Sequence, residues 1–230
     1  MEIFSKANYD VTVYPTKERC DATNKVAALS QDDYDLIVVS GGDGTLNEVI
    51  TGLMQSQLDI PIGYIPSGTL NEWSTGLGIS KIIKQAAKDI VTGKEITLDI
   101  GKFGDKYFTY TASFGAFTSA SYSAPQDIKN VLGQAAYFFE GIKSLGAIKP
   151  LHLKFEAEGK IIEDDFLFGA VSNSMSVGGI VKFDENTVKL NDGLFEVLLI
   201  KNPNNILKLQ HNPFPDISYM PFFHRKIKIY

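Results

Sequence analysis

The chain has 230 residues, enough for one large domain or two small ones, and 44% of them are hydrophobic, which suits a protein with a sizeable core. Its net charge of −5 argues against general nucleic-acid binding, which needs a basic surface. A single cysteine, Cys20, excludes an intrachain disulfide and fits a reducing compartment. Because the sequence has neither a long apolar run nor the apolar core of a signal peptide, we expect a cytoplasmic protein.

The first 93 residues alternate between segments typical of strands and segments typical of helices. Strands are predicted at residues 10–14, 36–39 and 60–65. Helices are predicted between them, at residues 21–29 and 46–54, and a further helix at 82–91. This β-α-β-α-β order predicts a parallel sheet with right-handed crossovers. Ligands of such sheets bind at the carboxyl ends of the strands.

Beyond Gly93 the composition changes to segments typical of strands, several of them joined by short turns. Strands are predicted at residues 96–102, 106–114, 151–157, 160–171, 194–201 and 226–230, and one helix at 126–145. Short turns between strands indicate antiparallel pairing. The sequence therefore predicts an α/β domain over residues 1–93 and a mostly antiparallel β domain over residues 94–230.

A glycine-rich turn follows the predicted strand at 36–39, with three glycines in the four positions 41–44. Glycine permits positive φ and lets another molecule approach the backbone. Thr45 and Glu48 have the spacing of a capping box, which predicts that the next helix begins at Thr45. The N–H groups of the turn and the helix dipole favour an anion, most often phosphate.

The pentapeptide Gly-Thr-Leu-Asn-Glu occurs twice, at residues 44–48 and 68–72, each time after a predicted strand. Thr69 and Glu72 repeat the capping-box spacing. We therefore expect two helix N-termini that are built in the same way, lie at one sheet edge and can share one polyphosphate. The alternative is that both segments are only good helix caps.

Asp43 places a carboxylate inside the first turn. A carboxylate repels bound phosphates unless a cation lies between them, so Asp43 predicts Mg²⁺ that bridges to phosphate oxygens. The alternative is that Asp-Gly is a common turn dipeptide. The turn matches neither the P-loop nor the dinucleotide-binding fingerprint.

Together, the segments 41–48 and 66–71 resemble the catalytic domain of the diacylglycerol kinase family, in its bacterial soluble lipid-kinase branch. The first motif is shared with NAD kinases, and Pro-x-Gly-Thr-x-Asn narrows the resemblance to lipid kinases. Further matching segments are Asp99, Ala112–Gly115, Leu132–Tyr137, Gly178–Gly179 and Asn191–Val197. The resemblance implies an α/β nucleotide-binding domain, a β-sandwich second domain and an ATP- and Mg²⁺-dependent kinase that phosphorylates a hydroxyl of diacylglycerol or a related lipid.

The resemblance also implies site residues. The implied ATP-binding residues are Thr16, Gly41, Gly42, Asp43, Gly44, Thr45, Leu46, Asn47 and Thr69. Asp43 is also the implied catalytic residue, through its metal. A structural Mg²⁺ is implied on the Asp192 carboxylate and the backbone carbonyls of Lys189 and Leu194, although Asn191-Asp192-Gly193 is otherwise a good turn before a strand.

The chain departs from the family pattern in three respects. It has Glu72 where the family usually has Asp, and it contains no Asp-Gly-Glu motif, whose Glu is thought to be the base that acts on the lipid hydroxyl. The family's opening strand and Asn-Pro turn are also absent, so we expect a working protein longer than these residues. An NAD kinase-like enzyme and a non-catalytic nucleotide-binding module therefore stay open as alternatives.

The expected partners are a lipid substrate and, transiently, a membrane surface, with a peripheral location beside the cytoplasmic one; nucleic acid is not expected, and a homodimer stays open. His152, His211 and His224 lack metal-ligand spacing and are expected to be surface or packing residues. The paired acids Asp164 and Asp165 are expected at a solvated strand end.

Overall fold

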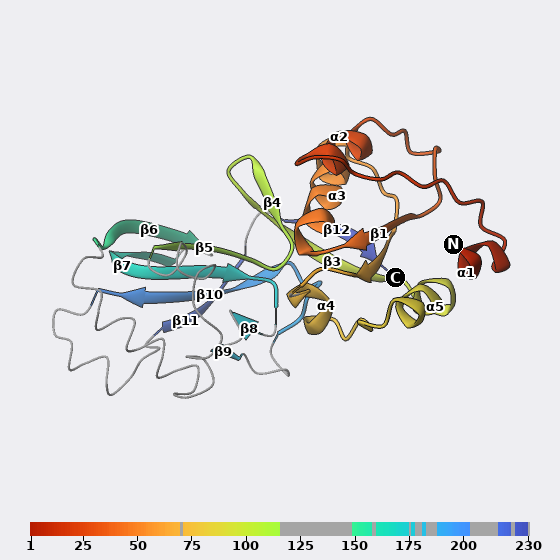
Figure 1. Cartoon of the computed structure of the whole chain (residues 1–230). Helices are drawn as coiled ribbons and strands as arrows, with labels where there is room; N and C mark the ends of the chain where they lie inside the picture. The colour runs from red at the N-terminus through yellow and green to blue at the C-terminus, as the bar shows by residue number, and fades with distance from the viewer. Residues whose placement is uncertain are drawn as a thin grey trace. The chain divides into compact units, whose positions relative to one another are not determined.

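The computed structural model describes residues 1–69, 71–115, 149–157, 160–174, 176–177, 181–182, 188–202, 216–221 and 224–229 (Figure 1). The chain forms two compact units. Unit 1 comprises Met1–Tyr110, Leu190–Gly193 and Phe223–Tyr230, and unit 2 comprises Thr111–Lys189 and Leu194–Phe222. The helix predicted at 126–145 lies outside the described residues.

Among the described residues, unit 1 contains a five-stranded sheet in the order β1-β2-β12-β3-β4. The strands are β1 (Ile37–Gly41), β2 (Ile62–Pro66), β12 (His224–Ile229), β3 (Ile96–Phe103) and β4 (Lys106–Phe108). β1 and β2 pair in parallel, with Gly41 opposite Pro66. β12 runs parallel to β2 and antiparallel to β3. The predicted parallel pairing is thus confirmed for β1 and β2, and antiparallel strands extend the sheet.

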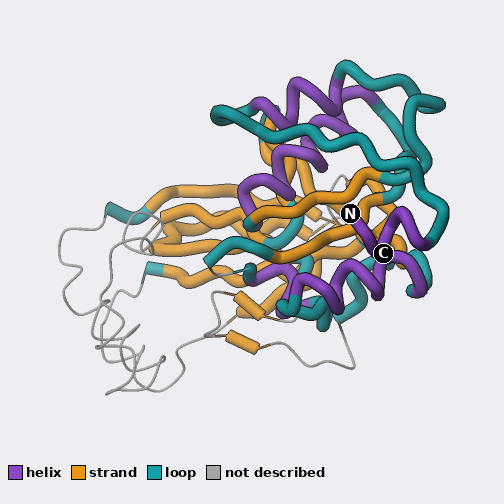
Figure 2. Tube along the Cα trace, turned by 45° about the vertical axis from the view of Figure 1, so that its right-hand side comes forward, coloured by secondary structure: helices purple, strands orange, loops and turns teal. Residues whose placement is uncertain are grey.

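Helices pack on both faces of this sheet (Figure 2). They are α1 (Glu2–Lys6), α2 (Asp21–Ala27), α3 (Asp43–Ser56), α4 (Glu72–Gly76) and α5 (Ile83–Thr92). β2 is buried along its whole length, as is usual for a parallel strand covered on both faces. Ile62 and Tyr64 join a core cluster with the apolar side of α3, whereas Ile65 joins a second cluster with α1 and α5. Within the described part of the chain, none of the helices combines the length and apolarity needed to cross a bilayer.

Residues 10–14 do not form the predicted strand. The segment has no regular secondary structure, and Val13 is 63% exposed. Side-chain contacts with α2 shape the following loop instead, since Tyr14 Oη donates to Asp21 Oδ1 at 2.9 Å and Lys17 N donates to Asp21 Oδ2 at 2.8 Å. Alternating apolar residues form a strand only where another strand offers backbone partners, and the described residues show no ladder for this segment.

Unit 2 is built on antiparallel strands, which confirms the predicted pairing. Its described strands run in the order β11-β10-β7-β5, with β6 also paired to β7, and β8 and β9 form a separate pair. Their bounds are β5 (Thr111–Gly115), β6 (Leu151–Ala157), β7 (Lys160–Ser172), β8 (Ser176–Val177), β9 (Val181–Lys182), β10 (Leu194–Lys201) and β11 (Asp216–Pro221). β7 has 13 residues and pairs with β6 along its first half and with β5 along its second. The single strand predicted at 106–114 is two strands, β4 and β5, which belong to different sheets.

The domain ranges 1–93 and 94–230 stay a prediction, and the compact units follow a different division. β3 and β4 lie beyond residue 93 but belong to unit 1, since β3 pairs with β12 and β12 pairs with β2. Residues 190–193 join the same unit because the Asp99 backbone N–H donates to Leu190 O at 2.8 Å and Gly193 N donates to Asp99 Oδ2 at 2.6 Å. Composition along the chain does not report such long-range pairing.

Candidate active site

The glycine turn lies at the carboxyl end of β1 and leads directly into α3. The helix begins at Asp43, with an extended Gly42 as N-cap and no side-chain cap. The predicted start at Thr45 with a Thr45–Glu48 capping box is therefore wrong, and the Glu48 carboxylate instead accepts a hydrogen bond from Cys20 N at 3.0 Å. The earlier start places the acidic Asp43 in the first turn of α3, where the helix dipole favours a negative charge. The first N–H groups of α3 have no acceptor within the helix and point out of its end.

The second copy of the pentapeptide folds differently from the first. Residues 44–48 are helical, whereas α4 begins only at Glu72, with Asn71 as a left-handed N-cap at φ 50°. The Asn71 amide closes the turn, since Gly68 N donates to its Oδ1 at 3.0 Å and its Nδ2 donates to Gly68 O at 2.7 Å. The prediction of two helix ends built alike, with Thr69 as second cap, is wrong. The second copy differs because its Asn71 amide is bonded to Gly68, whereas residues 44–48 continue α3.

The two turns nevertheless meet at one edge of the sheet, as predicted. Ser67 N donates to Gly41 O at 2.9 Å. A Cβ added to Gly68 would lie 2.5 Å from Gly42 Cα, so the backbones of the two turns are in direct contact. A ligand bound at one turn therefore lies beside the other.

The Asp43 carboxylate lies at this junction. Its Oδ2 accepts a hydrogen bond from Glu72 N at 3.0 Å and so occupies the N-terminus of α4. Its Oδ1 is buried and has no hydrogen-bond partner among the described residues. A buried carboxylate oxygen without a partner is unfavourable, and a divalent cation would satisfy it. Asp43 thus fits the predicted Mg²⁺. The N-terminus of α4, where a second phosphate contact was predicted, is already occupied by the Asp43 carboxylate.

Tyr64, a residue of β2, contacts both turns. It was not identified as a site residue from the sequence. Its side chain is fully buried on β2, and its one hydroxyl proton is shared between two acceptors, Gly41 O at 3.3 Å and Asn71 Oδ1 at 3.4 Å. Burial, and next the charge of Asp43, raises the pKa of Tyr64 to about 12, so the hydroxyl stays protonated. The sequence feature that could have identified Tyr64 as a site residue is its hydroxyl, two positions before Pro66 in an otherwise apolar strand.

We expect Tyr64→Phe to loosen the turns without unfolding the protein. The variant keeps the ring and loses one shared hydrogen bond, which contributes about 0.5–1.5 kcal/mol. The thermal midpoint should fall by a few degrees, and the additional stabilisation by Mg·ATP should shrink. Scanning calorimetry with and without Mg·ATP measures both effects. Tyr107→Phe, a half-buried tyrosine beside the same core, serves as control, and equal ATP effects in the two variants would contradict this role.

The other residues predicted to bind ATP differ in their suitability. Gly44 and Thr69 are exposed, and Thr45 and Asn47 are partly exposed. The Leu46 side chain is fully buried in the core and its N–H donates to Gly42 O at 3.1 Å, so this residue supports the helix rather than offering a ligand contact.

Thr16 is exposed in the segment before α2. Two hydrogen bonds to Glu48 connect the end of that segment and the start of α2 to α3. Cys20 N donates to the Glu48 carboxylate, and the Thr23 hydroxyl donates to the Glu48 carbonyl oxygen. The contacts of the described residues do not bring Thr16 to the glycine turn, and its part in ATP binding stays a prediction.

The residues predicted for a structural Mg²⁺ are divided between the units, with Asp192 in unit 1 and Lys189 and Leu194 in unit 2. Within unit 1, the fully buried Asp99 carboxylate holds the loop through Gly193 N. In the described part of the chain, no group of three or more His, Cys, Asp or Glu side chains is arranged to hold a metal ion. The predicted set is of another kind, with one carboxylate and two backbone carbonyl oxygens, and it stays a prediction.

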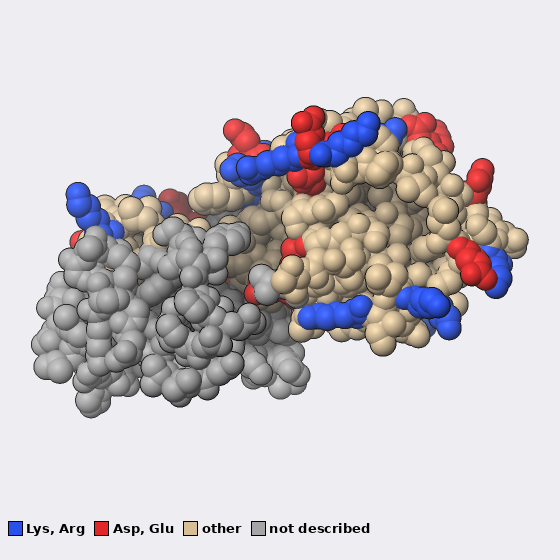
Figure 3. Space-filling model, in the orientation of Figure 1, with Lys and Arg blue, Asp and Glu red and all other residues tan. Residues whose placement is uncertain are grey.

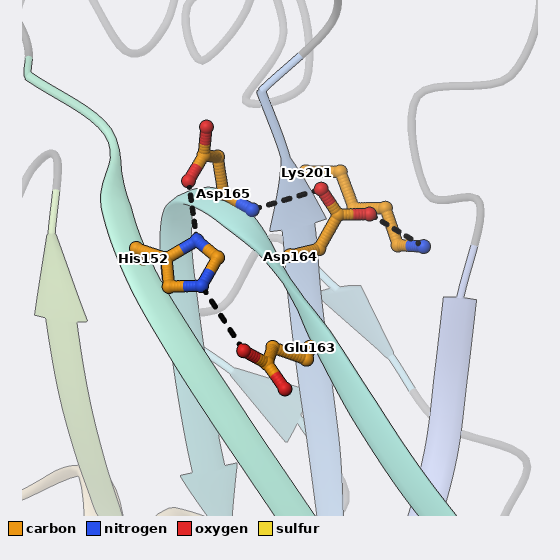
Figure 4. A network of polar contacts seen from close by, with 5 residues as sticks. All are labelled: His152, Glu163, Asp164, Asp165 and Lys201. Atoms are coloured by element: carbon orange, nitrogen blue, oxygen red, sulfur yellow. Dashed lines mark hydrogen bonds and ion pairs between the residues drawn. The ribbon is translucent and has the colours of Figure 1, made fainter.

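A second polar cluster lies on β6, β7 and β10 of unit 2 (Figure 4). His152 Nδ1 lies 2.8 Å from Asp165 Oδ1, and His152 Nε2 lies 3.3 Å from Glu163 Oε1. Lys201 Nζ lies 3.1 Å from Asp164 Oδ2. The paired acids therefore lie within β7 and are partnered by His152 and Lys201, whereas the sequence placed them at a strand end. Each acid has a cationic or titratable partner, which indicates a structural role.

This cluster predicts a pH-dependent stability of unit 2. The hydrogen bonds to Asp165 and then to Glu163 raise the pKa of His152. Protonated His152 therefore stabilises the folded state fully below the unfolded pKa of about 6.5, and the contribution disappears as pH rises through the higher folded pKa. Denaturant midpoints of the wild type and His152→Gln should differ most at acidic pH and converge at alkaline pH. A difference that stays constant with pH would contradict the prediction.

Residues 1–103 match the family described as "Diacylglycerol kinase catalytic domain". A diacylglycerol kinase of Bacillus subtilis (strain 168) is 33% identical over 205 residues, which cover 89% of this chain and 67% of that protein. A diacylglycerol kinase of Staphylococcus aureus (strain Newman) is 32% identical over 206 residues, 90% of this chain and 65% of that protein. A crystal structure of a diacylglycerol kinase from Bacillus anthracis str. Sterne matches with a TM-score of 0.68 and 27% identity, over 98% of this chain and 75% of that one.

This chain belongs to the diacylglycerol kinase family, which confirms the resemblance given by the two glycine motifs. It spans about two thirds of the length of the curated relatives that it matches.

Proposed function

We propose that this chain is an ATP-dependent lipid kinase that phosphorylates a hydroxyl of diacylglycerol or a related lipid. Membership of the family supports ATP as the phosphoryl donor and a lipid alcohol as the acceptor. The structural observation that carries the proposal is the contact of the two turns at one sheet edge, with the Asp43 carboxylate at their junction. Phosphoryl transfer requires positioning and charge neutralisation more than covalent help, and this site offers both.

The first turn is the proposed phosphate site. Its N–H groups lie at the N-terminus of α3, a helix of 14 residues whose dipole favours anions. A Cβ added to Gly44 would meet nothing within 4 Å, so a phosphate oxygen can approach this exposed backbone closely. Further proposed ATP contacts come from Thr16, Gly41, Gly42, Thr45, Asn47 and Thr69. Leu46 contributes by packing α3 against the core.

Asp43 Oδ1 is the proposed ligand of a Mg²⁺ ion that accompanies ATP. This oxygen is buried without a hydrogen-bond partner among the described residues, while Oδ2 is held by Glu72 N. A bound Mg²⁺ would neutralise charge on the phosphates and polarise them. The hydrogen bond from Glu72 N to Oδ2 holds the carboxylate in place and leaves Oδ1 for the metal. A separate structural Mg²⁺ is proposed on Asp192 and the carbonyls of Lys189 and Leu194.

The molecule that accepts the phosphoryl group distinguishes a lipid kinase from an NAD kinase-like enzyme and from a non-catalytic nucleotide-binding module. The purified chain is incubated with γ-labelled ATP and Mg²⁺, and with diacylglycerol, monoacylglycerol or ceramide in detergent micelles, or with NAD in solution. We expect Mg²⁺-dependent label in a lipid and none in NAD. Label in NAD would replace the proposal by a nucleotide kinase. ATP binding without label in any acceptor would favour the non-catalytic nucleotide-binding module, which the lack of an Asp-Gly-Glu motif in this sequence motivates.

A diacylglycerol substrate lies in a bilayer, so we propose a cytoplasmic protein with transient peripheral contact to a membrane surface. Whether the chain forms a homodimer is left open in this proposal. Sedimentation velocity measures its oligomeric state.

A further inference from the structure

The stretch of chain that carries both turns has no cationic side chain of its own. Residues 26–80 contain no Lys, Arg or His, although they include the acids Asp43, Glu48 and Glu72. A triphosphate brings several negative charges to this site, and phosphoryl transfer depends on their neutralisation. One Mg²⁺ and the dipole of α3 leave part of this charge unbalanced. A cationic side chain from another part of the chain would complete the site.

α2 and the loop before it bring cations to the side of the sheet on which α3 lies. α2 packs against α3, and its Ala22 and Val26 belong to the same core cluster as the apolar side of α3. The lysines of α5 belong to a helix that packs in the other core cluster. In Figure 3, Lys and Arg side chains gather in the region of α2 and the loop before it, whereas the surface in the region of α3 and β1 is mostly uncharged.

Hydrogen bonds fix the backbone on both sides of Arg19, a residue of this loop. Asp21 N donates to Glu18 O at 3.3 Å, which closes a turn around Arg19 and Cys20. Cys20 N donates to Glu48 Oε1 at 3.0 Å, so the turn is held against α3. The backbone of Arg19 therefore has a defined place beside this helix.

The place where the loop is held lies on the face of α3 that leads to the glycine turn. Glu48 follows Thr45 by three residues, which puts both on one face of the helix. The Thr45 side chain lies against the turn, since a Cβ added to Gly41 would lie 2.9 Å from Thr45 Cβ. Along the helix axis, Glu48 is about 7.5 Å from Asp43. An extended arginine side chain beside Glu48 is long enough to reach the start of the helix.

The Arg19 side chain is available for a ligand. It is exposed, and its guanidinium has no hydrogen bond or ion pair with any other residue that the structure describes, including the nearby acids Glu18 and Glu48. A fixed backbone with an uncommitted cationic side chain is the arrangement that a phosphate contact requires.

The two other cations of this region are already engaged. Lys25 Nζ lies over the Tyr14 ring, 5.5 Å from its centroid. Lys17 acts on Asp21: the pKa of the Asp21 carboxyl is lowered by hydrogen bonds from Lys17 N and Tyr14 and, to a smaller extent, by the charge of Lys17. Arg19 is therefore better suited than Lys17 or Lys25 to contact ATP.

We infer that the Arg19 guanidinium contacts the β- and γ-phosphates of ATP bound at the glycine turn. Its planar set of N–H donors matches phosphate oxygens, and it is always charged. The contact supplies the positive charge that residues 26–80 lack. The inference deepens the proposed function and rests on it, because it assigns a further residue to the same ATP site.

Titration calorimetry with Mg·ATP, Mg·ADP and AMP tests the contact. Arg19→Gln should weaken Mg·ATP and Mg·ADP binding about tenfold to a hundredfold, the effect of a charge-assisted hydrogen bond, and leave AMP binding unchanged. Arg19→Lys keeps the charge without the planar donors and should recover part of the affinity. Lys25→Gln removes a cation that is held over Tyr14 and should bind all three nucleotides like the wild type. An unchanged affinity of Arg19→Gln for Mg·ATP, or an equal loss for AMP, would overturn the inference.

Variants of Glu48 test the placement of Arg19 separately from its charge. Glu48→Ala removes the acceptor of Cys20 N and releases the loop from α3, so Mg·ATP affinity should fall about as much as in Arg19→Gln. Glu48→Gln keeps an oxygen acceptor and should retain most of the affinity. When Arg19→Gln and Glu48→Ala are combined, the losses should not add, because both changes remove the same contact. Additive losses would overturn the placement of Arg19 at the phosphates.

Labelling of lipid in detergent micelles separates this inference from the proposed function. Because Arg19 is exposed, Arg19→Gln should keep the wild-type thermal midpoint while its kcat/KM for ATP falls at least tenfold. If both proteins label lipid with the same kcat/KM for ATP, the Arg19 contact alone is overturned. If Mg·ATP affinity depends on Arg19 but the wild type labels no acceptor, the kinase alone is overturned. A wild type without affinity for Mg·ATP overturns both.

Discussion

Asp43→Asn should reduce phosphoryl transfer about a hundredfold to a thousandfold while the protein stays folded. The amide oxygen of asparagine can still accept the hydrogen bond from Glu72 N, so the N-terminus of α4 keeps its partner. The negative charge that would hold Mg²⁺ at the buried Oδ1 is lost. The kcat with Mg·ATP and the thermal midpoint together measure this separation of activity from stability.

Two further variants sharpen this test. Asp43→Ala should lose activity as well and also lose about 1 kcal/mol of stability, because Glu72 N is left without its acceptor. Asp33→Asn neutralises a surface acid that accepts a hydrogen bond from Ser30 N, and it should keep full activity. Undiminished activity in Asp43→Asn or Asp43→Ala would exclude the proposed metal role.

Gly68→Ala should separate the two turns and weaken ATP binding at least tenfold. The new Cβ would lie 2.5 Å from Gly42 Cα and 2.9 Å from Asn71 Oδ1. Contact of a side chain with backbone at such distances is relieved only when one turn moves, which costs about 1–3 kcal/mol of stability. Titration calorimetry with Mg·ATP and chemical denaturation measure the two losses.

Gly44→Ala is the matched variant for Gly68→Ala. A Cβ at Gly44 would meet nothing within 4 Å, and the residue is helical, so the free energy of unfolding should stay the same or rise by about 0.4–1 kcal/mol. ATP affinity should still fall, because the added methyl group occupies the proposed path of the phosphate. A stable Gly44→Ala protein with wild-type ATP affinity would place the phosphates elsewhere.

Periodicity predicted the elements whose positions depend on burial. α3 and α5 each bury one apolar side, and β2, β7 and β10 bury long apolar runs, so their bounds lie close to the predicted ranges. Residues 10–14 show the same kind of alternation but remain exposed and outside the sheets, because a strand also requires a partner that the alternation does not encode.

The candidate site could be predicted in part, because its glycines and Asp43 lie in one short segment. Its internal arrangement could not be predicted, because it depends on contacts between distant residues. Glu72 N meets Asp43 across 29 residues, and Gly193 N meets Asp99 across 94. The two identical pentapeptides differ through local contacts instead: Gly42 is the N-cap of one helix, whereas the Asn71 amide closes the other turn on Gly68.

The most direct test of the account is transfer of labelled γ-phosphate from ATP to diacylglycerol in detergent micelles, measured side by side for the wild type and Asp43→Asn. We expect a Mg²⁺-dependent labelled lipid product from the wild type and at most one hundredth of it from the variant. Equal labelling by the two proteins, or label in NAD with none in lipid, would contradict the account.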